Sequence, residues 1–411
     1  YITAPFFWFM EHPIDSFRVG RIIAVIFFCG GCFLIGKIVQ ALGGTARSFL
    51  YALFIYLSYP VMAGNYFQNR PDTYMTFFLL WGLYKWIVFL KNKKTKDLVW
   101  CYLFYFIAFA FLQKAIWFLF PFGLYQIYLL IKKEMKWSDL FKALIIPIFI
   151  TLGYGIYLTL SGSLIRYFEL NWILNMRYYR SYYTYDYDVL DYAYTGMYIT
   201  FALSGIVFGK KLIRQLSCVA LGFGLIFYLM PKPYGFYWTI FTPFAAIVIG
   251  LGLVNLTQSQ SLLKRSLSIG ILVLACFLTG LDLFTNALFV LDSPFEDETK
   301  QLSQRIKYDN ELVGYGDYRA PFFRNYPEHY YWFTLCRGAL YDSQLFHRHQ
   351  MPAWDKIVYE QKPKFVMYHE IYDVTDTDDN NTDKQILKLD EDWLLKNYHY
   401  IKSLDVFERI D

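Results

Sequence analysis

Long apolar stretches that recur along the first 290 residues constrain this sequence more than any other feature. Each is long enough to cross, or nearly cross, a hydrocarbon core about 30 Å thick. Only 18% of the residues are charged, whereas a soluble domain carries roughly 25%. We therefore expect a membrane protein with about ten spans, at residues 17–41, 46–64, 73–90, 98–112, 115–131, 140–160, 194–208, 216–230, 236–256 and 266–290.

The loops between these stretches alternate in charge. One set of alternate loops holds clusters of lysine and arginine, at residues 91–96, 132–136, 209–214 and 264–265. Short loops rich in lysine and arginine remain in the cytoplasm. The other loops, at residues 65–72, 113–114, 161–193 and 231–235, are then predicted to face outward. The alternation holds along the whole series, which supports this division into spans.

The composition changes after residue 290. A polar tail follows, in which strand-like runs such as KFVMYHEIYD alternate with helix-like runs such as DEDWLLKNY. Such alternation is typical of a small α/β domain. We predict an all-α polytopic membrane bundle of about ten transmembrane helices in residues 1–290, followed by a small extracytoplasmic α/β domain in residues 291–411.

Two groups of potential metal ligands are interpreted as structural. Cys29 and Cys32 have the spacing of a metal or redox motif, but they lie in mid-span without a second pair or a nearby histidine. We expect them to serve helix packing. The acidic loop at residues 373–384 lacks the glycine turn of an EF-hand and is expected to be solvated. Neither group is therefore predicted to hold a metal. No nucleic-acid partner is expected.

The sequence NRPD at residues 69–72 places charges at the start of the third predicted span. Pro71 ends any helix before it and fits the first turn of a helix after it. The Asp72 carboxylate would lie near the exposed amides of that helix. Because charges at membrane depth are costly and commonly functional, Asp72 and Arg70 are candidate catalytic residues. The alternative is a helix cap beside an interfacial arginine.

Lys114 lies between two apolar spans, without an acidic neighbour in sequence. Its ammonium group is suited to bind an anion, phosphate in particular. The alternative is an interfacial lysine whose stem lies in the apolar layer while its charge reaches water.

Two aromatic segments add further candidates on the same predicted face of the membrane. Residues 161–191 carry Arg166, Arg177 and Arg180 among many tyrosines, and arginine matches the geometry of phosphate. The alternative for this segment is an interfacial amphipathic helix. Residues 231–244 open a span with Tyr237 near its outer edge. A basic, aromatic, carboxylate-bearing cavity of this kind would suit a lipid-phosphate-linked sugar.

The order of these motifs resembles the class C membrane glycosyltransferases, specifically the protein mannosyltransferase and lipid A aminoarabinose transferase superfamily. YITAPFFWFM at residues 1–10 resembles the family's aromatic-proline segment, and FRVGRIIAVIF resembles the entry to its next span. NRPDTYMTFFLL resembles the acidic motif of the second outer loop, with Asp72 at the acidic position. FLQKAIWFLFP resembles the family's LTKG turn, with Lys114 at the lysine. FYWTIFTP resembles RYLLPLLP, with Tyr237 at the tyrosine, although Phe236 replaces the arginine.

The resemblance implies transfer of a sugar from a polyprenyl-phosphate donor to a lipid, glycan or protein acceptor. Under it, Lys114, Arg177, Arg180 and Tyr237 would bind the donor phosphate, while Asp72, held by Arg70, would orient the acceptor. It also implies that a first span and a catalytic acidic loop precede Tyr1, so that this chain is an N-terminally truncated member. Whether a divalent cation assists stays open. The expected location is the bacterial inner membrane, with an extracytoplasmic site.

Two other classes remain as alternatives. A transporter or flippase of lipid-linked sugars also needs many spans, but it commonly has repeated halves and charges near the midplane. An O-antigen ligase or polymerase performs related chemistry, with a large central outer loop. Charges gathered on one face and a C-terminal domain favour the glycosyltransferase.

Overall fold

The computed structural model describes most of the helical part of the chain and short pieces of its C-terminal part. The described residues are 13–58, 70–173, 189–229, 238–257, 312–315, 358–360, 362–368, 391–404 and 406–410, with isolated residues between 262 and 306. The chain divides into two compact units. One comprises Gly20–Tyr157 and Tyr183–Leu291, and the other comprises Tyr1–Val19, Leu158–Tyr182 and Asp292–Asp411.

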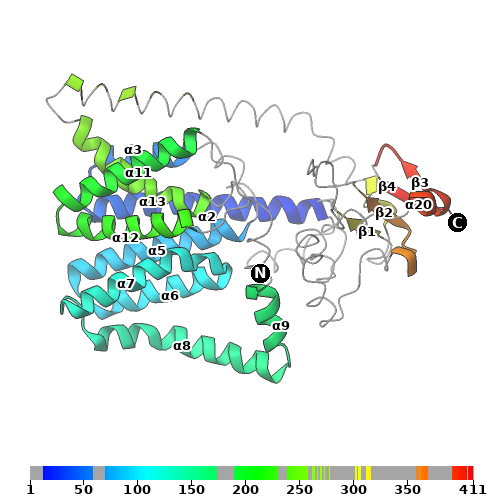
Figure 1. Ribbon diagram of the computed structural model, residues 1–411, viewed down its shortest axis with the longest axis horizontal. Helices are drawn as coiled ribbons and strands as arrows, with labels where there is room; N and C mark the ends of the chain where they lie inside the picture. The colour runs from blue at the N-terminus through cyan, green and yellow to red at the C-terminus, as the bar shows by residue number, and fades with distance from the viewer. Residues whose placement is uncertain are drawn as a thin grey trace. The chain divides into compact units, whose positions relative to one another are not determined.

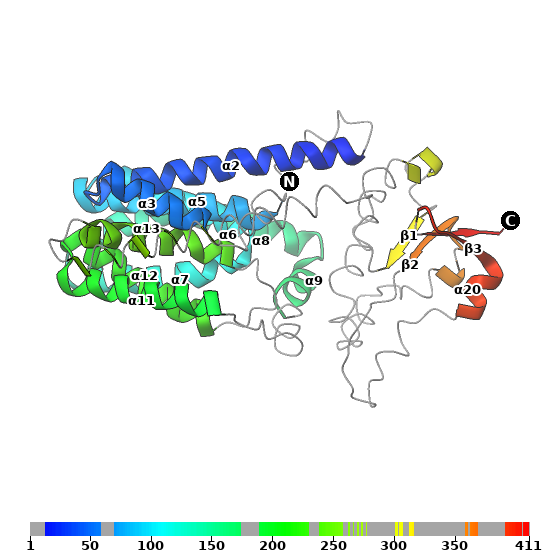
Figure 2. The same ribbon diagram turned by 90° about the horizontal axis from the view of Figure 1, so that it is seen from above.

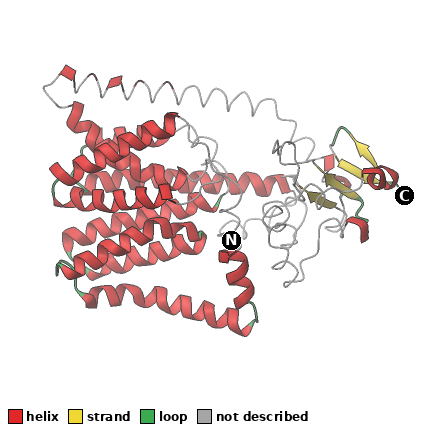
Figure 3. Cartoon of the chain, in the orientation of Figure 1, coloured by secondary structure: helices red, strands yellow, loops and turns green. Residues whose placement is uncertain are grey.

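The first unit is a bundle of helices (Figures 1 and 3). Its helices are α2 (Pro13–Ala41), α3 (Ala46–Leu57), α5 (Pro71–Asn92), α6 (Thr95–Phe111), α7 (Ile116–Ile131), α8 (Trp137–Leu160), α11 (Val189–Phe208), α12 (Lys211–Leu229) and α13 (Trp238–Thr257). A short 3-10 helix, η1 (Gln113–Ala115), joins α6 to α7. Figure 2 shows that α5, α6, α7, α11, α12 and α13 run along a common direction.

Five helical stretches are long and apolar enough to cross a membrane: Arg18–Ala41, Pro71–Asn92, Gln113–Ile131, Trp137–Leu160 and Lys211–Leu229. Three shorter apolar helices are Ala46–Leu57, Thr195–Val207 and Trp238–Val254. Most of the tenth predicted span, residues 266–290, lies outside the described residues. The structure therefore supports a polytopic membrane bundle, whereas the count of ten spans stays a prediction.

Glycine residues, which have no side chain, allow the closest contacts between helices. Helix α5 packs against α6, and α3 packs against α13. A β-carbon at Gly82 of α5 would lie 2.3 Å from the ring of Tyr105 in α6, and one at Gly250 would lie 2.6 Å from the backbone of Ala52. Small residues let helix backbones approach closely within a membrane. Gly82 thus sets the spacing of the α5–α6 hairpin, which positions the site described below.

Alternating helix directions give the bundle two ends. The start of α5, the end of α6 and the start of α7 lie at one end, here called the Asp72 end. At the other, the basic end, the α5–α6 loop meets the α7–α8 loop. Lys93 Nζ donates to the Glu134 carbonyl at 3.0 Å, and Thr95 Oγ1 donates to Asp139 Oδ1 at 2.7 Å. These two hydrogen bonds show that the α5–α6 and α7–α8 loops lie at the same end of the bundle.

The second unit contains a mixed four-stranded sheet. Its strands are β1 (Leu312–Tyr315), β2 (Phe365–Tyr368), β3 (Tyr398–Ile401) and β4 (Val406–Arg409), in the order β1-β2-β4-β3. Strands β1 and β2 are parallel, and the other neighbours are antiparallel. Helix α20 (Glu391–Asn397) precedes β3. A small core contains Leu302, Phe365, Leu404 and Val406. The strands and helix agree with the predicted α/β character of the tail.

Candidate functional site

The first turn of α5 positions Asp72. Arg70 is the N-cap residue, with an extended backbone (φ −112°, ψ 144°), and Pro71 opens the helix. Proline disfavours the helical conformation in the residue before it, which explains why the helix begins here. Asp72 follows in the first turn, where the backbone amides carry a partial positive charge that favours a carboxylate. The predicted helix start at NRPD is confirmed.

The Asp72 carboxylate is almost completely buried. The residue is 3% exposed, and its Oδ2 accepts a hydrogen bond from Arg70 Nε at 3.4 Å. Its Oδ1 is also buried and has no hydrogen-bond partner. Buried polar atoms in native proteins nearly always have a partner. Asp72 therefore keeps an unused acceptor that a donor entering the site would satisfy.

Lys114 reaches the same place from the α6–α7 connection. It lies in η1, is half-buried, and interacts electrostatically with both Asp72 and Arg70. The ring of Tyr74, in the second turn of α5, stacks on Phe111 at the end of α6, with centroids 5.5 Å apart. This contact joins the two helix ends. The structure thus brings together Asp72, Arg70 and Lys114, which the sequence had placed on separate loops.

The remaining predicted site residues, Arg177, Arg180 and Tyr237, lie outside the described residues. Arg166 is exposed on α9 (Leu164–Phe168), which belongs to the other compact unit. Trp238, which follows Tyr237, begins α13 and is buried. Its ring lies 5.2 Å from Phe227, and Phe227 lies 6.1 Å from Trp117, one turn after Lys114. The start of α13 is therefore at the Asp72 end of the bundle.

An aromatic layer extends from the Asp72 end into the bundle. Its rings belong to Phe27, Tyr74, Phe77, Phe78, Trp81, Phe104 and Phe111. The closest pair, Trp81 and Phe104, stacks at 4.3 Å. Apolar surroundings lower the local dielectric and strengthen the interactions among the charges above. The layer also holds α5, α6 and α2 in fixed register.

Thr76 is a polar residue at this end that the sequence analysis missed. It is 2% exposed, and its Oγ1 has no hydrogen-bond partner. It follows Asp72 by four residues, and residues four apart lie on the same face of a helix. Two buried, unsatisfied oxygen atoms, Asp72 Oδ1 and Thr76 Oγ1, thus face the same side of α5. The i, i+4 spacing was visible in the sequence, but burial of the hydroxyl was not.

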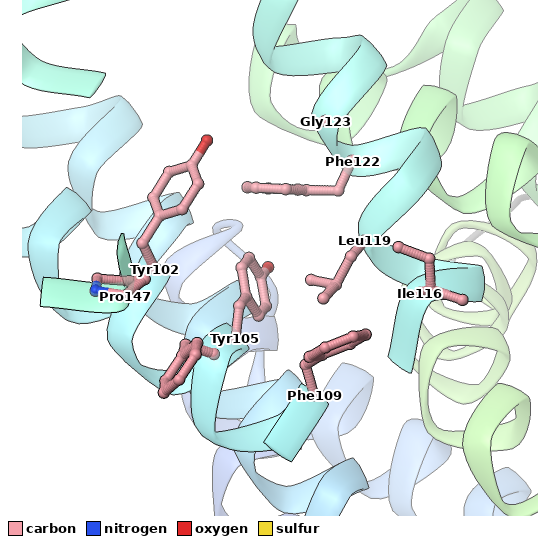
Figure 4. Close-up of a pocket in the computed structure, with 9 residues that line it drawn as sticks. Tyr102, Tyr105, Phe109, Ile116, Leu119, Phe122, Gly123 and Pro147 are labelled. Atoms are coloured by element: carbon pink, nitrogen blue, oxygen red, sulfur yellow. The ribbon is translucent and has the colours of Figure 1, made fainter. Parts of the chain in front are cut away.

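A pocket of about 310 Å³ lies between α6, α7 and α8 (Figure 4). It is lined by Tyr102, Tyr105, Phe106, Phe109, Ile116, Leu119, Phe122, Gly123 and Pro147. Tyr102 of α6 and Phe122 of α7 point toward one another across it, with ring centroids 6.3 Å apart. Ile116 lines the pocket only two residues after Lys114. The lining suits an apolar chain better than a charged group.

Among the described residues, no group of three or more histidine, cysteine, aspartate or glutamate side chains is close enough to hold a metal ion. Asp72 supplies one carboxylate, and its recorded ionic neighbours are cations. In the described part of the site, the charged neighbours of Asp72 are therefore cations and not further carboxylates. The question of metal assistance stays open.

A helical bundle of membrane-spanning length, with a buried carboxylate and two cations at one end, defines an integral membrane protein with a polar site near the end of its spans. Residues 6–154 match the family model for dolichyl-phosphate-mannose-protein mannosyltransferase. This match supports the resemblance to the membrane glycosyltransferase superfamily that the motifs indicated.

The matched region includes both Asp72 and Lys114, whereas Arg177, Arg180 and Tyr237 lie beyond it. No curated protein and no solved structure matches the chain. The family match therefore covers the first part of the bundle, which contains the three charged residues that the structure brings together.

Proposed function

We propose that this protein transfers a sugar from a polyprenyl-phosphate donor to an extracytoplasmic acceptor, which is a lipid, a glycan or a protein. The observation that carries the proposal is the cluster of Asp72, Arg70 and Lys114 within the region matched by the mannosyltransferase family. A glycosyl phosphate already has a good leaving group. The protein must therefore mainly stabilise the phosphate that departs and position the acceptor.

In the proposed reaction, an acceptor oxygen attacks the anomeric carbon as the bond from that carbon to the phosphate oxygen breaks. Lys114 stabilises the negative charge that gathers on the phosphate. Asp72 accepts a hydrogen bond from the acceptor hydroxyl through the free Oδ1, while Arg70 holds Oδ2. By the family resemblance, a carboxylate of a catalytic acidic loop takes the proton that the acceptor hydroxyl loses, and the donor leaves as the polyprenyl phosphate. Inversion at the anomeric carbon is expected from the family resemblance.

The apolar pocket supports a lipid-linked donor. It begins beside Ile116, two residues from Lys114, and extends among aromatic side chains of α6 and α7. A prenyl chain seated there would place its phosphate near the lysine. Arg177, Arg180 and Tyr237 are proposed as further phosphate ligands from the sequence motifs alone. The basic loops favour a cytoplasmic location for the opposite end, so the site and the C-terminal domain would be extracytoplasmic, in a bacterial inner membrane.

The test is sugar transfer by the full-length protein in vesicles, with radiolabelled polyprenyl-phosphate mannose as the donor and membrane extract as the acceptor. Asp72→Asn and Lys114→Ala should each lower the rate by about a hundredfold or more, as expected when a positioning or charge-stabilising group is lost. Asp97→Asn and Lys142→Ala are matched controls away from the Asp72 end and should change the rate less than about threefold.

Three results would contradict the proposal. Unchanged transfer in both site variants would remove the assigned roles of Asp72 and Lys114. Movement of the labelled donor across the vesicle membrane without a new glycosidic bond would favour a transporter or flippase. The sequence does not specify the donor sugar. If no transfer from the mannose donor is observed, the assay is repeated with donors that carry hexoses, pentoses and amino sugars. Failure with all of them would contradict transferase activity.

A further inference from the structure

The basic end of the bundle is a single surface built from three loops. The α5–α6 and α7–α8 loops are joined by the bonds from Lys93 to Glu134 and from Thr95 to Asp139. The start of α12 joins them through an ion pair of 2.9 Å between Lys211 Nζ and Glu134 Oε2. These three contacts therefore hold lysines that are far apart in the sequence beside one another.

The carboxylates of these loops are already engaged by internal partners. Asp97 pairs with Lys85 at 3.4 Å. Asp139 accepts a hydrogen bond from Thr95. Glu134 pairs with Lys211 and also accepts from Gln215 Nε2 at 3.4 Å. These acidic groups therefore do not neutralise the other lysines of the loops.

Seven exposed lysines in these loops and at the adjoining helix ends are here called the lysine surface: Lys91, Lys94, Lys96, Lys132, Lys133, Lys136 and Lys210. All seven are exposed, and no ion pair is recorded for them among the described residues. Tight turns hold them close, because Lys93 and Lys133 adopt left-handed conformations with φ of 54° and 57°. Crowded like charges create a positive potential that attracts anions.

Aromatic side chains place the lysine surface at the level of lipid headgroups. Trp137, at the start of α8, is 57% exposed and lies against the exposed ring of Phe141. Trp100 is also exposed, in the second turn of α6. Tryptophan beside lysine at the end of a span is typical of the interface between hydrocarbon and water. The anions available at that depth are phospholipid headgroups.

We infer that the lysine surface is a binding site for anionic phospholipid headgroups, with phosphatidylglycerol as the simplest ligand of this class. The Lys132, Lys133 and Lys136 cluster provides its centre, since these three lysines follow one another within a single turn between α7 and α8. This inference does not depend on the proposed transferase activity, because the site lies at the opposite end of the bundle from Asp72.

The test is native mass spectrometry of the full chain, purified in detergent and mixed with equal amounts of phosphatidylglycerol and phosphatidylcholine. The wild-type protein should retain phosphatidylglycerol in preference. The K132Q/K133Q/K136Q variant should lower the affinity for phosphatidylglycerol by about a hundredfold, since each lysine near an anionic surface contributes about a fivefold gain in affinity. Its phosphatidylcholine binding should not change.

A matched control carries three Lys→Gln substitutions in the other unit, at exposed or half-exposed Lys364, Lys396 and Lys402, and should retain the lipid preference. Equal retention of the two lipids by the wild type would overturn the inference, and so would an equal loss in the control variant. If the first variant does not fold, the wild type is measured in about 1 M salt, where exposed charges are screened. A preference that persists there would also overturn the inference.

Discussion

The two ends of the helical bundle carry charge in opposite ways. At the Asp72 end, a few charges lie together at partly or fully buried positions, and one carboxylate oxygen of Asp72 has no hydrogen-bond partner. At the basic end, many lysines are exposed, while the carboxylates of Asp97, Glu134 and Asp139 each have an internal partner.

This difference separates two kinds of interaction. A buried charge interacts strongly over a short range, and its unsatisfied oxygen atom favours a ligand that can donate a hydrogen bond. Exposed charges are screened by salt and contribute little individually, although together they attract oppositely charged surfaces. The first arrangement is suited to one bound substrate, and the second is suited to a membrane surface.

The strongest test of the comparison is a double-mutant cycle on sugar transfer. If Asp72 and Lys114 act as one unit, Asp72→Asn and Lys114→Met should each lower the rate by about a hundredfold, and the double variant should be little slower than either one. The matched pair at the basic end, Asp97→Asn and Lys85→Met, should change the rate less than about threefold. If the loss of rate in the double variant at the Asp72 end equals the product of the two single losses, Asp72 and Lys114 act independently.

The next largest effect is expected from Gly82→Ala. The new β-carbon would lie 2.3 Å from the buried Tyr105 ring, so that α5 must move away from α6. Overpacking of this kind typically destabilises a protein by about 1–3 kcal/mol. Because the same hairpin brings Asp72 to Lys114, transfer should fall together with the midpoint of thermal unfolding in detergent.

The control for this substitution is Gly153→Ala in α8, where a β-carbon would have no heavy atom within 4 Å. Alanine is favoured over glycine in a helix by about 1 kcal/mol, so this variant should be as stable as the wild type or slightly more stable. A similar loss in both variants would indicate that the α5–α6 spacing is not what Gly82 controls.

Hydropathy predicted the middle of the helices better than their ends. The span predicted at 73–90 is observed as Pro71–Asn92, and the one predicted at 140–160 is observed as Trp137–Leu160. Helix ends carry proline, charged and capping residues that lie outside the hydrocarbon layer, so an apolar window does not include them. The motif NRPD did predict the start of α5, because Pro71 acts locally.

The sequence could predict the site only where the alternating direction of the spans places loops on the same face of the membrane. Asp72 and Lys114 lie on predicted loops of the same face, which was enough to expect that they are neighbours. The pocket had no comparable signal, because Tyr102, Tyr105 and Phe122 lie in runs that are apolar on every side. The partners of Glu134 were also hidden, since Lys93 and Lys211 come from distant loops and approach only after the helices pack.

A smaller effect, with opposite signs at the two ends, is expected from Thr→Val substitutions. Thr76 Oγ1 is buried without a partner, so Thr76→Val should leave stability unchanged or raise it by about 1 kcal/mol. Thr95 Oγ1 donates to Asp139, so Thr95→Val should lower stability by about 1 kcal/mol. The measurement is thermal unfolding of both variants in one detergent. A clear loss in Thr76→Val would mean that water or a ligand satisfies that hydroxyl.

The smallest effect should come from Lys211→Gln. The side chain of Lys211 is 69% exposed although its ammonium lies 2.9 Å from Glu134, and exposed ion pairs typically contribute about 0–1 kcal/mol. Glu134 also keeps its hydrogen bond from Gln215. We expect a change below about 1 kcal/mol in unfolding free energy that disappears in high salt, whereas the effects at the Asp72 end should persist there. A larger, salt-independent loss would mean that the basic end also depends on a buried ion pair, and the contrast between the two ends would fail.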